Sequence, residues 1–158
     1  MTKLSKTLKI VSGLVKAGLA RDFAIGGGYA LNYYLEPLLT YDLDIFILIE
    51  TDEDYSVIYE YFRSRKYKIE NVYIIIGGVP VQFLPSYIHP LIVEAIKNAK
   101  IIELDGGKYK IFSVEYLIAA LMMAFRPKDK MAIPQLLQQA DKEKLEERLA
   151  KLSGGVAV

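Results

Sequence analysis

The sequence predicts an α/β (α+β) fold, in which a mixed β-sheet is flanked by helices and followed by a C-terminal helical part. Short apolar runs bounded by glycine or proline alternate with amphipathic stretches over about 1–112, which is typical of strands and helices in turn. From Ser113 onward only helical patterns remain. The chain has 158 residues and is 53% hydrophobic, enough for a substantial core. We therefore expect a single domain over 1–158, with an α/β core over about 1–112 and helices over about 113–153.

The N-terminal part predicts a helix, a strand and a second helix. Apolar side chains recur there at helical spacing, at Leu4, Leu8, Val11 and Val15. This spacing predicts an amphipathic helix over 3–18 that ends at Gly18. The apolar run 23–25 predicts a strand that leads into a glycine turn, and residues 29–35 suit a short helix that Pro37 ends.

Residues 42–50 form the most apolar segment of the chain. From Ile45 onward both faces are apolar, which indicates a central strand covered on both sides. Thr51 follows as an N-cap, and Asp54 stands at the capping-box position. These two residues predict a helix over about 52–65.

Two pairs of strand-like runs are joined by glycine-containing turns, which predicts two β-hairpins. The runs and turns are 67–76, Gly77-Gly78 and 79–84 in the first hairpin, and 100–104, 105–107 and 108–112 in the second. Residues 91–99 predict a short helix between the hairpins. Each hairpin contributes antiparallel pairs to the expected sheet.

The C-terminal part predicts three helices. Ser113 caps a helix that runs to about Phe125, and Pro127 suits the first position of the next helix. The last helix is amphipathic through Leu145, Leu149 and Leu152. We expect Gly154-Gly155 to end it. These helices either complete the core or form the seam of a homodimer.

Composition excludes several classes of function. The 20 basic side chains nearly balance the 19 acidic ones, and no basic tract indicates a surface that binds nucleic acid. The absence of cysteine excludes disulfides, thiolate metal sites and a cysteine nucleophile. The N-terminus lacks the apolar core of a signal peptide, and the longest apolar stretch, 111–125, is too short to span a bilayer. We expect a cytoplasmic protein with no membrane contact.

The strongest indication of chemistry is the pair Asp42 and Asp44 at the start of the central strand. Side chains at i and i+2 of a strand point to the same face, so both carboxylates project together. Two like charges at the edge of an apolar strand repel each other, and a cation between them relieves that cost. The alternative is a solvated strand start beside a loop, where aspartate is common.

The glycine triplet Gly26-Gly27-Gly28 precedes the acidic pair. Glycines allow backbone N–H groups to approach a phosphate near the N-terminus of a helix. The alternative is a tight turn that only requires positive φ angles. The Gly-x-Gly-x-x-Gly dinucleotide motif is absent.

Together these segments resemble the nucleotidyltransferase fold superfamily, in which a glycine turn and a short helix precede an acidic pair on the next strand. The resemblance is closest to small prokaryotic stand-alone and AbiEii-like nucleotidyltransferases, with Gly-Gly-x-Ala-Leu followed by Thr-x-Asp-x-Asp. The corresponding segments here are Gly27-Gly28-Tyr29-Ala30-Leu31 and Thr40-Tyr41-Asp42-Leu43-Asp44, and thirteen residues separate Gly28 from Asp42. The segments at 113–119 and 126–129 resemble helical parts of that group, so the similarity covers roughly 20–140.

The resemblance implies a Mg²⁺-dependent (or Mn²⁺-dependent) transfer of a nucleoside monophosphate from a nucleoside triphosphate to an unknown acceptor, which is a protein, an RNA or a small molecule. Asp42 and Asp44 would be the metal ligands, in keeping with the preference of Mg²⁺ for carboxylates. Gly26, Gly27 and Gly28 would contact the phosphates, and Thr40 would either shape the turn or touch a phosphate. Tyr29 or Tyr33 is expected to stack on the base.

The chain departs from the family pattern at several positions. The family usually carries a third carboxylate on a later strand, and Gln82 stands there in this sequence. An amide can coordinate a metal through its carbonyl oxygen, but it is neutral and cannot act as a base. Relatives also often carry arginine where this chain has Leu38. The alternative function is therefore a catalytically degenerate binding module, or a component of a toxin–antitoxin pair, without turnover.

Overall fold

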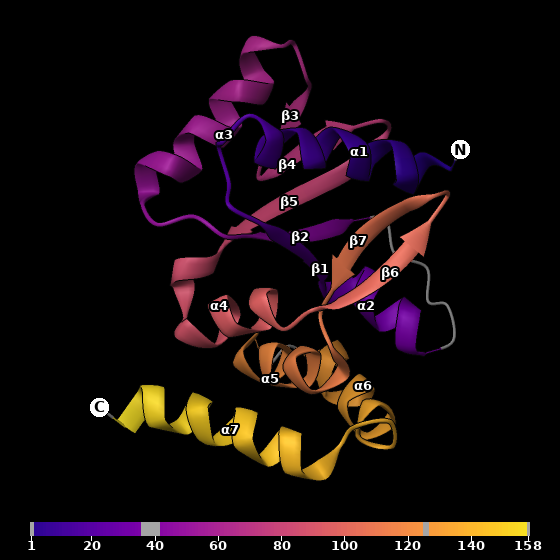
Figure 1. Ribbon diagram of the computed structural model, residues 1–158, viewed down its shortest axis with the longest axis vertical. Coiled ribbons are helices and arrows are strands. Elements are labelled where there is room, and N and C mark those ends of the chain that lie inside the picture. Colours follow the sequence, from indigo (N-terminus) through magenta and orange to yellow (C-terminus); the bar gives the residue numbers. More distant parts are fainter. Residues whose placement is uncertain (1, 36–41, 125–126, 158) are drawn as a thin grey trace.

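The computed structural model describes residues 2–35, 42–124 and 127–157. Within these residues the strands form one seven-stranded sheet with the order β3-β4-β5-β2-β1-β7-β6 (Figure 1). The strands are β1 (Phe23–Gly26), β2 (Leu43–Ile47), β3 (Ile69–Glu70), β4 (Tyr73–Ile76), β5 (Val79–Pro85), β6 (Lys100–Leu104) and β7 (Gly107–Ile111). The strand β2 lies at the centre of the sheet, as its apolar sequence predicts.

The sheet is mixed. The pairs β2–β5 and β1–β7 are parallel, and the other neighbouring strands are antiparallel. The two sequence-predicted hairpins are the pairs β4–β5 and β6–β7. Gly77 and Gly78 both have positive φ angles, of 60° and 83°, and the turn pairs Ile76 with Val79. The predicted class, a mixed sheet flanked by helices, is confirmed.

Helices cover both sides of the sheet. They are α1 (Lys3–Lys16), α2 (Gly27–Tyr34), α3 (Asp52–Ser64), α4 (Pro90–Lys97), α5 (Val114–Ala124), α6 (Pro127–Leu137) and α7 (Lys142–Ala157), with a 3₁₀ turn η1 (Ser86–Ile88). Figure 1 shows α1 and α3 on one side of the sheet and α4–α7 on the other. The helix α2 packs against both β2 and α5.

The central strand is apolar on both faces from Ile45 onward and is covered on both sides, as predicted, although the two faces differ in burial. Leu43, Ile45 and Ile47 point to the α1/α3 face and are completely buried. On this face Phe62 of α3 stacks on Phe83 of β5, with ring centroids 5.8 Å apart. Burial of side chains of this size contributes about 1.5–3 kcal/mol each. The residues between them, including Asp44, lie on the other face and are only partly buried.

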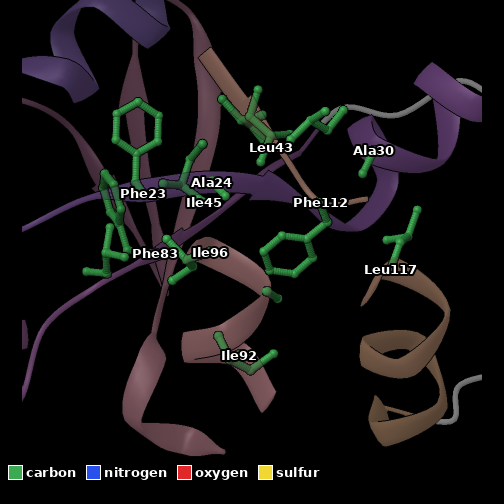
Figure 2. Packing of buried hydrophobic residues seen from close by; sticks show 14 of the residues in the cluster. Phe23, Ala24, Ala30, Leu43, Ile45, Phe83, Ile92, Ile96, Phe112 and Leu117 are labelled. Carbon is green, nitrogen blue, oxygen red and sulfur yellow. The ribbon is translucent and has the colours of Figure 1, made fainter. Parts of the chain in front are cut away.

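The second face is closed by α2, α4 and α5. Phe46 of β2 contacts Phe112, with ring centroids 4.8 Å apart. Figure 2 shows Phe112 near Ile96 of α4 and Leu117 of α5, in one buried cluster. The polar start of β2 therefore lies at the edge of an apolar region.

Several element boundaries differ from the sequence prediction, and three of these differences involve glycine or a turn residue. Residues 67–76 form two short strands, because Asn71, with φ of 56°, turns the chain between β3 and β4. The helix α2 begins at Gly27 rather than Tyr29, so two of the glycines belong to its first turn. The helix α7 continues to Ala157, and the prediction that Gly154-Gly155 ends it is wrong. A glycine costs a helix only about 1 kcal/mol relative to alanine, which does not by itself stop it.

Candidate functional site

The candidate site begins with a row of side chains across four adjacent strands. Asp44 of β2 pairs with Gly26 of β1 on one side and with Gln82 of β5 on the other. Gln82 in turn pairs with Tyr73 of β4. Residues directly opposite each other in a sheet present their side chains to the same face. The row therefore places a carboxylate, an amide and a phenol side by side.

Asp42 lies just before β2, and its side chain belongs to the same face. The Tyr73 hydroxyl donates a hydrogen bond to Oδ2 of Asp42, with 3.1 Å between the oxygens. Because Tyr73 shares a face with Asp44 through Gln82, the two carboxylates project to the same side of the sheet. The structure thus places Asp42, Asp44 and Gln82 on the same side of the sheet.

Gly27, the first residue of α2, lies directly against the side chain of Asp44. It has a φ of +57°, a conformation that side chains with a Cβ atom adopt rarely. A Cβ atom placed there would lie 2.1 Å from Oδ2 of Asp44. Two independent constraints therefore require glycine, and the carboxylate of Asp44 lies against the first turn of α2.

Gly26 and Gly28 have different surroundings. A Cβ atom on Gly26 would lie 2.5 Å from the Phe46 ring, so Gly26 allows the strand to pack over that ring. Gly28 is in the first turn of α2 and is partly exposed. Its backbone N–H belongs to the end of the helix that favours anions.

A pocket of about 290 Å³ adjoins the row. It is lined by Gly27, Asp44, Phe46, Gln82, Leu84, Leu117, Ala120 and Leu121. One wall is the sheet face with its two polar side chains, and the opposite wall is the apolar side of α5. A ligand in this pocket would meet a carboxylate and an amide at one end and aliphatic side chains elsewhere.

The donor set matches the oxygen chemistry of Mg²⁺. Two carboxylates and an amide carbonyl are hard oxygen ligands of the kind that Mg²⁺ combines with water and substrate phosphates. Among the residues that the structure describes, no group of three or more His, Cys, Asp or Glu side chains could hold a metal ion. The described site therefore supplies two acidic ligands, and substrate oxygens and water would have to complete the coordination.

The predicted nucleotide contacts at the glycines, Thr40 and Tyr29 stay predictions. Thr40 lies outside the described residues, as do Leu38 and Arg126. Tyr29 is in the first turn of α2, next to Gly28, and packs partly buried against the core. Tyr33 is 46% exposed at the other end of α2, where Lys100 lies over its ring.

Tyr73 is the residue of the candidate site that sequence reasoning missed. The hairpin turn at Gly77-Gly78 pairs Ile76 with Val79, and counting outward along the ladder pairs Tyr73 with Gln82. This signal was present in the sequence, because turn geometry fixes the register of a hairpin. The parallel pairing of Asp44 with Gln82 has no such local signal.

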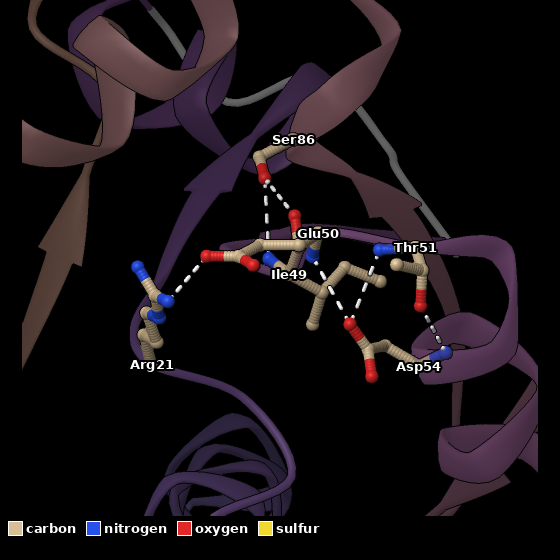
Figure 3. Close-up of polar contacts among 6 residues, drawn as sticks. All are labelled: Arg21, Ile49, Glu50, Thr51, Asp54 and Ser86. Atoms are coloured by element: carbon tan, nitrogen blue, oxygen red, sulfur yellow. Dashed lines mark hydrogen bonds and ion pairs between the residues drawn. The ribbon is translucent and has the colours of Figure 1, made fainter.

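A second polar cluster lies at the opposite end of β2 (Figure 3). Oδ2 of Asp54 accepts hydrogen bonds from the backbone N–H of Glu50 at 3.2 Å and of Thr51 at 3.1 Å, and these bonds lower the pKa of its carboxyl. Arg21 forms an exposed ion pair with Glu50. The hydroxyl of Ser86 accepts a hydrogen bond from the backbone N–H of Ile49 and donates one to its carbonyl oxygen. These contacts cap α3 and fix a loop, so they are structural.

Within the described part of the chain, every helix is too short or too polar to cross a lipid bilayer. No protein-family model matches the sequence, and no curated protein matches it either. Similarity to known proteins is therefore assessed from the fold.

Solved structures with a similar fold are nucleotidyltransferases. An antigenic nucleotidyltransferase-like protein from Paracoccidioides brasiliensis superposes with a TM-score of 0.61 at 16% identity, over 95% of this chain and 86% of that chain. The solution structure of the antibiotic-resistance factor ANT(2″)-Ia superposes with a TM-score of 0.55 at 16% identity, over 98% of this chain and 91% of that chain. ANT(2″)-Ia in complex with adenylyl-2″-tobramycin gives 0.52 at 18% identity, over 95% of each chain. The chain therefore has the nucleotidyltransferase fold.

Proposed function

We propose that this protein is a nucleotidyltransferase that binds Mg²⁺ (or Mn²⁺) and a nucleoside triphosphate, and transfers the nucleoside monophosphate to an acceptor. The observation that carries the proposal is the close approach of the Asp44 carboxylate to Gly27, at the glycine start of α2. The fold supports the same reaction class.

Each side chain of the site has a separate role in this proposal. Asp42 and Asp44 hold the metal ion, which when bound neutralises triphosphate charge and favours displacement at the α-phosphorus. The backbone N–H groups of Gly27 and Gly28 bind phosphate oxygens at the N-terminus of α2. The amide of Gln82 offers one acceptor and two donors toward the substrate. The α5 wall excludes water from one side of the pocket.

The acceptor could be a protein, an RNA or a small molecule. One solved neighbour, ANT(2″)-Ia, is bound to adenylyl-2″-tobramycin, an adenylylated small molecule. This supports a small-molecule acceptor as the first class to screen. Free nucleotides and Mg²⁺ are abundant in the cytoplasm, where we place the protein.

Calorimetry tests the binding half of the proposal. ATP, CTP, GTP and UTP are titrated with Mg²⁺ into the wild type, Asp42→Ala and Asp44→Ala. We expect at least one nucleotide to bind the wild type and to lose its Mg²⁺-dependent affinity in both variants. Glu103→Ala, which removes an exposed carboxylate from β6, is the matched control and should bind as the wild type does. Failure of all four nucleotides to bind the wild type would refute the proposal.

Gln82 favours a second candidate function, a nucleotide-binding module without turnover, such as a component of a toxin–antitoxin pair. Gln82 pairs with Asp44 in the parallel ladder, and this neutral side chain stands where the family usually carries a third carboxylate. In that case nucleotide binding persists, and turnover appears only in Gln82→Asp. Release of pyrophosphate by the wild type with any acceptor would exclude this second candidate.

A further inference from the structure

We propose that Tyr73 is a positioning residue that holds the carboxylate of Asp42 for metal binding. The inference rests on the proposed function, because it concerns the same acidic pair. Its basis is the 3.1 Å hydrogen bond from the Tyr73 hydroxyl to Oδ2 of Asp42, a contact between residues 31 positions apart in the chain.

The location of Asp42 explains why such a contact matters. Asp44 is held within β2 by pairing on both sides, whereas the paired part of β2 begins at Leu43, one residue after Asp42. The bond from Tyr73 ties the side chain of Asp42 to a residue that is itself anchored in β4.

Tyr73 reaches Asp42 from two strands away. The strand β5 lies between β4 and β2, and neighbouring strands are about 4.8 Å apart. A side chain of tyrosine length can cross β5 and still end at the carboxylate. A shorter donor such as serine or threonine at position 73 could not.

A phenol is chemically suited to this task. A carboxylate has about four lone-pair sites on its two oxygens, so one hydrogen bond to Oδ2 leaves acceptor sites for a cation. The phenol is neutral, whereas a lysine or arginine in its place would neutralise Asp42 and compete with the metal ion. Carboxylates that ligate metals are themselves commonly hydrogen-bonded, and loss of such a partner typically weakens metal affinity about 10- to 100-fold.

The test compares Tyr73→Phe with Tyr87→Phe. Both variants remove a tyrosine hydroxyl that donates to an aspartate, since Tyr87 donates to Asp52 in an exposed position at the start of α3. Mg²⁺ is titrated calorimetrically into each protein saturated with the α,β-methylene analogue of the triphosphate that the wild type binds most tightly. We expect the Kd for Mg²⁺ to rise about tenfold in Tyr73→Phe and to stay unchanged in Tyr87→Phe.

A double-mutant cycle separates positioning from a general structural effect. In an Asp42→Asn background, Tyr73→Phe should leave the remaining Mg²⁺ affinity unchanged, because the carboxylate that it positions is gone. Thermal melting of each variant without Mg²⁺ reports whether the fold itself is affected.

The outcomes distinguish this inference from the function on which it rests. If the wild type binds nucleotide and Mg²⁺ while Tyr73→Phe binds Mg²⁺ equally well, the role of Tyr73 is refuted and the proposed function stands. An equal loss in the Asp42→Asn background would also refute it. If the wild type binds neither nucleotide nor Mg²⁺, both proposals fall together.

Discussion

At the scale of single residues, the carboxylate of Asp44 restricts position 27 to glycine. Its Oδ2 atom occupies the space in which any side chain at position 27 would begin. Asp44 is also paired on both sides within the sheet. Gly27 is therefore fixed by packing as well as by its backbone angle.

The first prediction compares the replacement of Gly27 by alanine with the same replacement at Gly18. Gly27→Ala should lower stability by more than Gly18→Ala, although both positions have positive φ angles. A Cβ atom at Gly18 meets nothing within 4 Å, so that variant carries only the backbone cost, about 1–2 kcal/mol. Urea unfolding measures the difference. Equal losses in the two variants would show that Asp44 moves aside without cost.

At the scale of elements, α3 shows how local chemistry fixes a boundary. The hydroxyl of Thr51 accepts a hydrogen bond from the backbone N–H of Asp54 at 3.1 Å, and the Asp54 carboxylate bonds back to the N–H of Thr51. The sequence predicts this capping box and the helix start, and the structure confirms both. The same local rules predict the two hairpins, because the turn residues specify the pairing.

The cap provides a second prediction. Thr51→Ala should reduce the free energy of unfolding by about 1 kcal/mol, because it removes one bond of the capping box. Ser56→Ala, at an exposed position within the same helix, should change it by less than about 0.5 kcal/mol. Urea unfolding of both variants checks the prediction. A loss in Ser56→Ala as large as that in Thr51→Ala would contradict it.

Asp54 provides a third prediction, for pH. Backbone N–H bonds lower its pKa below the ordinary value of 3.8, so the folded state binds this proton less readily than the unfolded state. The stabilising contribution is therefore present above about pH 4 and is lost as the pH falls through the lowered pKa.

Thermal melts between pH 5 and pH 2 measure this effect. The wild type should lose more stability over that range than Asp54→Asn, which has no carboxyl group to titrate. Parallel Tm curves for the two proteins would show that the cap does not depend on the charge of Asp54.

At the scale of the whole molecule, the buried face between the sheet and α1/α3 holds the chain together. Phe62 and Phe83 are both at most 1% exposed and stack on each other across this interface. Neither ring contributes to the pocket beside Asp44. Stability and the candidate site thus depend on opposite faces of one sheet.

This separation gives a fourth prediction. Phe62→Ala should reduce the free energy of unfolding by about 3–5 kcal/mol, the usual cost of emptying a buried aromatic site. Leu84→Ala, on the pocket side, should cost less because Leu84 is only partly buried. Chemical denaturation of both variants tests the order. A larger loss in Leu84→Ala would show that the pocket face carries more of the core than its exposure indicates.

The sequence by itself determined the local parts of this protein: the amphipathic helices, the cap at Thr51, the two glycine hairpins, and the presence of two aspartates on one strand face. Each depends on residues within a few positions of one another, where backbone and side-chain preferences act directly; of the two aspartates, only Asp44 lies within β2, and Asp42 precedes it. Only the tertiary structure decided that β2 pairs in parallel with β5, which brings Gln82 to Asp44, and that α5 closes the pocket. Parallel pairing and helix docking join distant segments through burial of apolar surface, which is not directional and leaves no local mark in the sequence.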